Sequence, residues 1–174
     1  MRIVNNLPEC LLALAPGVAF VVHGNDYDAL EWPKDKHGQD LPGKPTYEDL
    51  LAQQSVTALQ LAQSRKLTEL ERACRAEIVG GFESSVLGSA HRYDSAETDQ
   101  LNLIGAAALG VDLQYRCTDV ATGVKQHRLH THAQIAQVLA DGAAIKMTLL
   151  QTLAAKRAQV EAAESIEEIE EISW

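Results

Sequence analysis

The stretch from Thr46 to Val79 contains neither proline nor glycine, and it limits the possible folds of this chain more than any other part of the sequence. Proline and glycine interrupt helices most strongly, and the next ones are Gly80 and Gly81. At the start of the stretch, the Thr46 hydroxyl can cap free backbone amides, and acidic residues in the following turn favour a helix N-terminus. The sequence therefore predicts one helix over residues 46–81, about nine turns long.

A mostly apolar stripe runs along this predicted helix at spacings of three and four residues. It comprises Ala52, Val56, Leu59, Gln63, Leu67, Leu70, Cys74 and Ile78. From Val56 onward the spacing repeats every eleven residues, which keeps the stripe on one face of a nearly straight helix. Two interpretations remain open. The stripe packs on its own domain, or it forms an oligomeric seam in which Gln63 sets the register.

Composition agrees with a mostly helical protein. Apolar residues make up 46% of the 174 residues, enough for a sizeable core in one domain, or in one domain with an appendage. Aromatic residues are only 5%, whereas the chain has 25 alanines and 22 leucines, which favour helices. The composition therefore speaks against a large all-β fold.

The net charge of −9 is concentrated near the C-terminal end. Of 24 acidic residues, six glutamates follow Val160 without a lysine or arginine, so the preceding residues hold 18 acidic against 15 basic ones. Nucleic-acid affinity comes largely from clustered lysine and arginine. The charge balance therefore argues against a nucleic-acid partner.

The most apolar run, from Leu11 to Val22, is short and contains Pro16 and Gly17. It is too short to span a bilayer and lacks the charged region of an export signal, so we expect no membrane insertion. The three cysteines are widely spaced, without a Cys-x-x-Cys motif, and are expected to be reduced and partly buried. They are Cys10, Cys74 and Cys117.

Residues 1–32 are predicted to form a small β-type module. The run from Leu11 to Val22 is expected to be a buried strand or a packed turn. Val18 to Trp32 can hold one or two short strands, joined by a turn at Gly24 to Asp26. Residues 33–45 contain three prolines and two glycines, and are predicted to be an extended linker that divides this module from the rest.

Residues 82–174 are predicted to form an α+β domain. Phe82 to Tyr93 is expected to be a short strand or an irregular loop, and Ser95 to cap a helix that ends at Gly110. The clearest hairpin joins Val111–Cys117 to Val124–Leu129 through Thr122 and Gly123. The expected fold class is therefore α+β and predominantly helical, with a long helix, a small helix and hairpin domain, and a short N-terminal β module.

Two further helices are predicted near the C-terminal end. The first begins at Thr131, is broken or capped again at Asp141 and Gly142, and continues as an apolar stripe to Val160. Ser165 and Glu168 form a capping box that starts a final short helix. The apolar side chains of this helix, including Ile169, Ile172 and Trp174, are expected to dock on the domain or to anchor a partner.

Two clusters carry the residue types of metal or catalytic sites. Among His127, His130 and His132, only His130 and His132 could share a strand face, so a third metal ligand is missing. Ser84, Ser85, Ser89 and Ser95 lie near His91, Asp94 and Asp99, yet the chain has no Gly-x-Ser-x-Gly elbow. We therefore predict no catalytic residue, no cofactor and no metal, with His130 and His132 as the remaining metal candidates.

Several sequence runs resemble a phage-encoded domain of uncharacterised function. They are Arg75–Gly88, His91–Ser95, Asp99–Leu103 and Ala163–Trp174, which together span roughly Glu69 to Trp174. Upstream, Leu30–Pro33 and Pro45–Leu50 are similar to small phage tail proteins in general. The resemblance implies a protein encoded among tail genes, of the kind described as tail fibre or tail fibre assembly proteins. It implies no established catalytic residue.

We therefore expect a non-enzymatic bacteriophage tail protein that assists assembly of a receptor-binding tail fibre or attaches to it. The alternatives are a permanent structural component of the tail, fibre or baseplate, and a small metal-dependent enzyme that uses the histidine cluster. Expected partners are other tail or fibre subunits and further copies of the chain, in the host cytoplasm during assembly or in the virion tail. The side chains expected to make these contacts are Val56, Leu59, Gln63, Leu67, Leu70, Ile169, Ile172 and Trp174.

Overall fold

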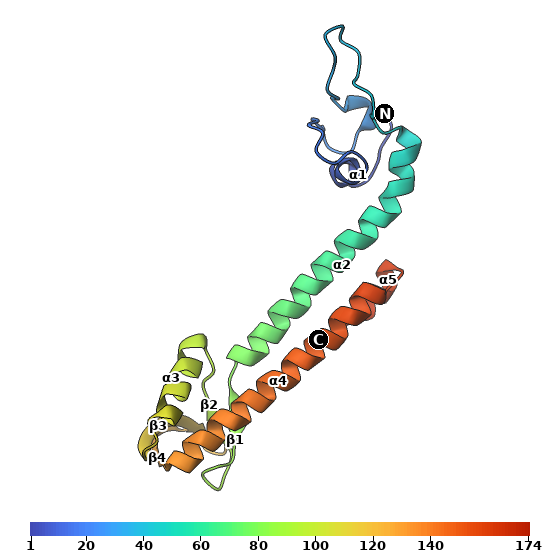
Figure 1. The fold of residues 1–174 in the computed structure, drawn as a ribbon. Coiled ribbons are helices and arrows are strands. Elements are labelled where there is room, and N and C mark those ends of the chain that lie inside the picture. The colour runs from blue at the N-terminus through green and yellow to red at the C-terminus, as the bar shows by residue number, and fades with distance from the viewer. The chain divides into compact units, whose positions relative to one another are not determined.

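A computed structural model describes all residues from Met1 to Trp174. Its elements are α1 (Leu7–Leu14), a 3-10 turn (Tyr27–Ala29), α2 (Tyr47–Val79), β1 (Phe82–Ser84), β2 (His91–Tyr93), α3 (Glu97–Ala108), β3 (Leu113–Asp119), β4 (Lys125–His130), α4 (His132–Ala162) and α5 (Ile166–Glu171). The fold is α+β and mostly helical, as predicted (Figure 1). The chain forms two compact units, one of residues 1–66 and 163–171, the other of residues 67–162 and 172–174.

The long helix α2 forms where the sequence predicts it. Thr46 Oγ1 accepts a hydrogen bond from Asp49 N at 3.1 Å, and Asp49 Oδ2 accepts one from Thr46 N at 3.0 Å. These two bonds satisfy backbone amides that a helix N-terminus leaves free. The hydrogen bond from the Thr46 hydroxyl also lowers the pKa of the Asp49 carboxyl. Gly80 and Gly81 then follow the last helical residue, Val79.

The N-terminal residues do not form the predicted β-type module. Leu7–Leu14 is the helix α1, and β pairing is limited to single bridges such as Val21 with Glu31. Pro8 lies in the first turn of α1, where a missing backbone N–H is tolerated. The prediction of a strand from Leu11 fails because Leu7, Cys10 and Leu11 recur at helical spacing and are all buried.

Residues 33–45 do not divide two domains, which corrects a second prediction. The Leu41 N donates to Pro33 O at 2.7 Å, and the Trp32 indole Nε1 donates to Leu41 O at 3.0 Å, so the segment folds back on itself. Trp32 shares a hydrophobic core with α1 and with Leu50 of α2. This core extends past the proposed linker into α2, and the boundary between the two units lies inside that helix.

The short helix α5 belongs to the first unit and begins at the predicted cap. Glu168 N donates to Ser165 Oγ at 3.2 Å, and Glu164 N donates to Glu168 Oε2 at 2.8 Å. Ile169 of this helix is buried. An isolated helix this short is unstable in water, so burial of Ile169 is what holds it.

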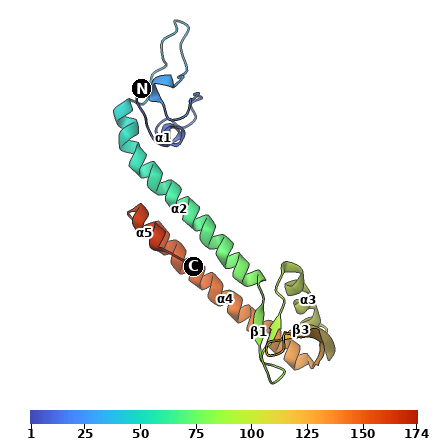
Figure 2. The ribbon, with the colours of Figure 1, turned by 180° about the vertical axis from the view of Figure 1, so that it is seen from behind.

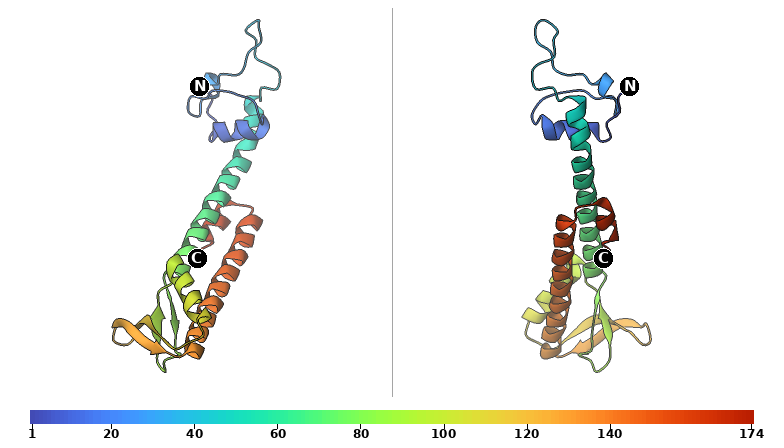
Figure 3. Two further views of the ribbon diagram at one scale, coloured as in Figure 1. Left: turned by 60° about the vertical axis from the view of Figure 1, so that its left-hand side comes forward. Right: turned by 90° about the vertical axis from the view of Figure 1, so that its right-hand side faces the viewer.

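The second unit contains an antiparallel sheet with the strand order β1-β2-β3-β4. The β3–β4 hairpin is the predicted one, and Gly123 in its turn has a φ of 69°. One face of the sheet packs on α3 and the first turns of α4 (Figures 1 and 2). The turn between β3 and β4 lies at the end of the sheet away from α4 (Figure 3). The buried residues of this core are Phe82, Tyr93, Leu103, Cys117, Ile135 and Val138.

Helix α4 is continuous from His132 to Ala162, so the predicted break at Asp141 and Gly142 does not occur. A Cβ added at Gly142 would lie 2.6 Å from Phe82 Cζ. The glycine is therefore explained by close packing of an aromatic ring against the helix, rather than by a helix end. A second boundary also differs from prediction: α3 begins after Ala96, whose N donates to Asp99 Oδ2 at 3.2 Å, and not at a Ser95 cap.

The apolar stripe on α2 is buried along only part of its length. In the second unit Leu70 and Cys74 are buried, and Cys74 Sγ lies 3.8 Å from Leu149 O of α4. In the first unit, Gln63 Nε2 donates to Ala163 O at 3.4 Å, whereas Val56 is 48% exposed. The stripe thus has partners within the chain at its C-terminal part and faces solvent at Val56.

Candidate functional site

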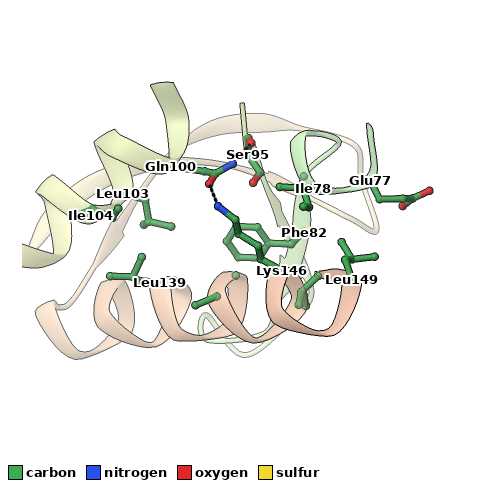
Figure 4. A pocket seen from close by; sticks show the side chains of 14 residues that line it. Glu77, Ile78, Phe82, Ser95, Gln100, Leu103, Ile104, Leu139, Lys146 and Leu149 are labelled. Atoms are coloured by element: carbon green, nitrogen blue, oxygen red, sulfur yellow. Dashed lines mark hydrogen bonds between the residues drawn. The ribbon is translucent and has the colours of Figure 1, made fainter. Parts of the chain in front are cut away.

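The second unit contains a pocket with a mostly apolar lining between α3, α4, β1 and the end of α2. Its volume is about 160 Å³. The apolar lining comes mainly from Ile78, Phe82, Leu103, Ile104, Leu139 and Leu149 (Figure 4). Gly142 and Ala143 of α4 complete the wall, and the small size of these two residues leaves the space open. A pocket with this lining suits an apolar group.

Two charged side chains line the same pocket. Lys146 of α4 reaches past Phe82 toward α3, where its Nζ donates to Gln100 Oε1 at 2.9 Å (Figure 4). Gln100 is itself held, since its Nε2 donates to Ser95 O at 2.9 Å. Glu77 points away from the pocket (Figure 4). The pocket therefore has an apolar interior and one positioned ammonium group at its edge.

Next to the pocket, the sheet buries a hydrogen-bonded tyrosine and histidine. The Tyr93 hydroxyl lies 2.8 Å from His130 Nε2, and His130 Nδ1 lies 2.8 Å from Arg128 O. Because a carbonyl only accepts, Nδ1 carries the proton and Nε2 accepts from the tyrosine hydroxyl. Burial raises the pKa of Tyr93 and lowers the pKa of His130, so both groups stay neutral near pH 7. This pair is closed to solvent and acts as core structure.

A second buried histidine, His91, has one nitrogen without a hydrogen-bond partner. Its Nδ1 lies 2.9 Å from Ser89 O, whereas its Nε2 lies 3.8 Å from Asp119 Oδ2 and makes no hydrogen bond. Asp119 also lies 3.4 Å from Arg128 Nη2. Hydrogen bonds from the backbone at Thr122 lower the pKa of the Asp119 carboxyl. His91, Asp119 and Arg128 therefore link β2, β3 and β4 at the polar end of the sheet.

The three histidines of the candidate metal cluster are not brought together. His130 is buried against Tyr93, His127 is exposed on β4, and His132 is the exposed first residue of α4. No group of three or more His, Cys, Asp or Glu side chains in the structure could hold a metal ion. The predicted arrangement, in which His130 and His132 share a strand face, fails because the strand ends between them.

The candidate serine, histidine and acid residues are also separated by their contacts. Ser84 Oγ donates to Asp141 Oδ2 at 2.5 Å, and His91 contacts the backbone of Ser89 rather than a serine hydroxyl. Asp94 lies on the surface, where a hydrogen bond from Lys125 lowers the pKa of its carboxyl. No serine, histidine and carboxylate form a hydrogen-bonded chain.

The residues predicted for interaction lie in different environments. Leu70 and Ile169 are buried, whereas Leu59, Gln63, Leu67, Ile172 and Trp174 are partly exposed and Val56 is exposed. Lys156 Nζ donates to Ser173 O, which fastens the C-terminal residues to α4.

The sequence analysis did not identify the pocket residues, because they come from four separate elements. Gly142 inside a helical pattern was the available signal for close packing.

Helix α4 has a further property that sequence reasoning did not identify. By length and composition it is the one helix that could cross a membrane, and only 11% of its most apolar 18-residue stretch is buried. Such a helix is weak support for a membrane span. It does indicate that α4 presents apolar side chains to its surroundings, among them Met147 and Leu150.

Residues 61–173 match a family described as Domain of unknown function (DUF4376). No curated protein and no solved structure matches the chain. The matched region includes the sheet, α3, α4 and the whole of the apolar pocket. This chain therefore belongs to the DUF4376 family of domains of unknown function.

Proposed function

We propose that this chain is a non-enzymatic bacteriophage tail protein that assists assembly of a receptor-binding tail fibre or attaches to it. The assignment to a phage tail rests on Arg75–Gly88 and His91–Ser95, which resemble tail-associated domains and lie inside the matched family region. The assignment of a binding role rests on the surface around the pocket.

The observation that carries the binding role is a group of large apolar side chains exposed on the helices of the pocket. Leu101 of α3 is 69% exposed, and Met147 of α4 is 60% exposed. Ile104 is also exposed and lines the pocket, so the exposed apolar surface of α3 borders it. Extended apolar surface on a protein commonly marks an interaction site. A fibre or tail subunit could bury this surface through side chains alone, without any reaction.

Co-purification with a fibre subunit tests the proposal. The chain is co-expressed with the tail fibre subunits of the phage that encodes it, and we expect one of them to be retained through an affinity tag on the chain. Changing Leu101 and Ile104 together to glutamate places charge on the apolar surface and should abolish retention. Leu12→Glu on α1, where the side chain is also exposed, is the matched control and should retain the fibre subunit.

Purified phage particles distinguish assembly from permanent attachment. An assembly protein is absent from particles or present below stoichiometry, whereas a structural component is present in a fixed ratio to the fibre. Retention of no fibre or tail subunit, together with absence from particles, would show that the proposal is wrong. Association between copies of this chain stays a prediction, to be measured by light scattering.

A further inference from the structure

The edge of the apolar pocket carries a lysine that no acidic side chain neutralises. Lys146 Nζ has one hydrogen-bond acceptor, the neutral amide oxygen of Gln100, and no carboxylate oxygen lies within 4.0 Å of it. Several other cations of the same unit are paired, including Arg75 with Glu97 and Arg157 with Glu71. An ammonium group has three N–H donors, so Lys146 keeps two for another acceptor.

The position of this ammonium group is fixed by a chain of hydrogen bonds. Ser95 O holds the Gln100 amide, and Gln100 holds Lys146, so that the charge lies between α3 and α4 at the pocket edge (Figure 4). Glu77, the other charged lining residue, points away from the pocket (Figure 4). The charge next to the apolar interior is therefore the positive Lys146 ammonium group, which favours a bound group with a negative charge.

The volume of the pocket limits the apolar group that fits. A cavity of about 150 Å³ lined by Leu, Ile and Phe accommodates one benzene ring. The pocket of about 160 Å³, with Phe82 and Leu103 in its wall, has the same size and chemistry. One phenylalanine or leucine side chain fills it, whereas an extended acyl chain does not fit.

We infer that the pocket binds a partner polypeptide through a phenylalanine-sized apolar side chain next to an acidic residue, whose carboxylate pairs with Lys146. The inference rests on the proposed function for its choice of a polypeptide as ligand. The apolar side chain occupies the space between Phe82, Leu103 and Leu149, and the carboxylate accepts the free N–H donors of the lysine. Burial of the ring supplies most of the affinity, and the ion pair selects acidic segments.

Titration of the purified full chain with three capped peptides tests the inference, with backbone amide shifts as the readout. The peptides are acetyl-Gly-Phe-Glu-Gly-amide, its Phe-Gln counterpart and its Ala-Glu counterpart. We expect the Phe-Glu peptide to shift the amides of Ile104, Ala143 and Lys146 and to bind with a Kd of about 1 mM. The Phe-Gln peptide should bind about threefold more weakly, and the Ala-Glu peptide about tenfold or more.

Two variants and their controls assign the binding to the pocket. Lys146→Gln should remove the preference for Phe-Glu over Phe-Gln, whereas Lys36→Gln, an equal charge change in the other unit, should keep it. Ala143→Leu fills the pocket with a good helix former and should abolish the shifts. Ala155→Leu, on an exposed part of α4 outside the pocket, should not change them.

Several results would overturn the inference. They are no amide shift with about 5 mM Phe-Glu peptide, equal affinity for all three peptides, or an unchanged preference in Lys146→Gln. Binding of 3-phenylpropionate without binding of the Phe-Glu peptide would assign the pocket to a small acid instead of a polypeptide. None of these measurements involves a phage tail, so failure here is distinguishable from failure of the fibre co-purification.

Discussion

The ring of Phe82 lies so close to Gly142 that a Cβ at this helical position would be 2.6 Å from Phe82 Cζ. A glycine inside a helix destabilises it by about 1 kcal/mol relative to alanine, so its presence needs a packing reason. Contact between β1 and α4 supplies that reason, because Phe82 of β1 packs directly against Gly142 of α4. The same ring forms part of the wall of the pocket.

Gly142→Ala should therefore destabilise the protein despite the better helix propensity of alanine. Overpacking against Phe82 should outweigh the propensity gain and lower the free energy of unfolding by about 1–3 kcal/mol. Gly105→Ala is the matched control, since no atom lies within 4 Å of a Cβ added there. We expect this control to stabilise the protein by about 0.5–1 kcal/mol. Urea denaturation measures both, and a more stable Gly142→Ala would contradict the packing explanation.

Truncation of Leu70 tests whether the α2 stripe is a seam within one chain. Leu70 is buried in the single chain, so Leu70→Ala should lower the free energy of unfolding by about 2–5 kcal/mol without changing the mass in solution. Val56→Ala should change it by about 0.5 kcal/mol or less, since Val56 is exposed. Denaturation and light scattering provide the readouts. A fall in mass for Leu70→Ala would favour the oligomeric seam.

The C-terminal helix α5 should contribute to stability through Ile169. Because this side chain is buried, Ile169→Ala should lower the free energy of unfolding by about 2–5 kcal/mol. Glu170→Ala, an exposed neighbour on the same helix, serves as the control and should leave the melting temperature nearly unchanged. If Ile169→Ala melts normally but loses the fibre subunit, α5 is a partner anchor instead.

The buried His130 should make stability depend on pH. Burial lowers its pKa in the folded protein, whereas the unfolded chain takes up the proton near the ordinary value of about 6.5. The free energy of unfolding should therefore fall as the pH drops below about 7, by up to about 1.4 kcal/mol per pH unit until the folded pKa is reached. Denaturation at pH 7.5 and pH 5.5 measures this slope. His130→Gln should reduce this dependence of the free energy of unfolding on pH, whereas the control His127→Gln, at an exposed position, should not. Equal slopes in both variants would show that His130 is not the cause.

Flotation with phosphatidylcholine vesicles tests the expectation of no membrane insertion. Helix α4 is apolar enough to raise the question, but Asp141, Lys146, Lys156 and Arg157 are spread along it. Each such charge costs about 2.5–3.5 kcal/mol at the centre of a membrane helix. The chain should therefore stay in the aqueous fraction. Flotation that is lost in Met147→Glu would overturn the expectation and assign the exposed face of α4 to lipid.

The elements that can be predicted from the sequence are those whose signals are local. The absence of proline and glycine from Thr46 to Val79 determines α2, and Thr46 with Asp49 determines where it begins. Alternation of apolar and polar residues with a Gly123 turn determines the β3–β4 hairpin, and Ser165 determines the start of α5. These signals involve neighbours in the chain, so propensity, capping and periodicity are sufficient to identify them.

Tertiary packing decided the remaining features, because they depend on residues far apart in the sequence. Gly142 lies inside a continuous helix, where its lack of a side chain leaves room for Phe82, and residues 33–45 fold back next to Trp32, which is buried with Leu50. The candidate pocket also combines four separate elements, and its single positioned charge depends on the contact of Lys146 with Gln100. Local propensity contains no information on such contacts, since burial of distant side chains outweighs a helix breaker or a proline-rich composition.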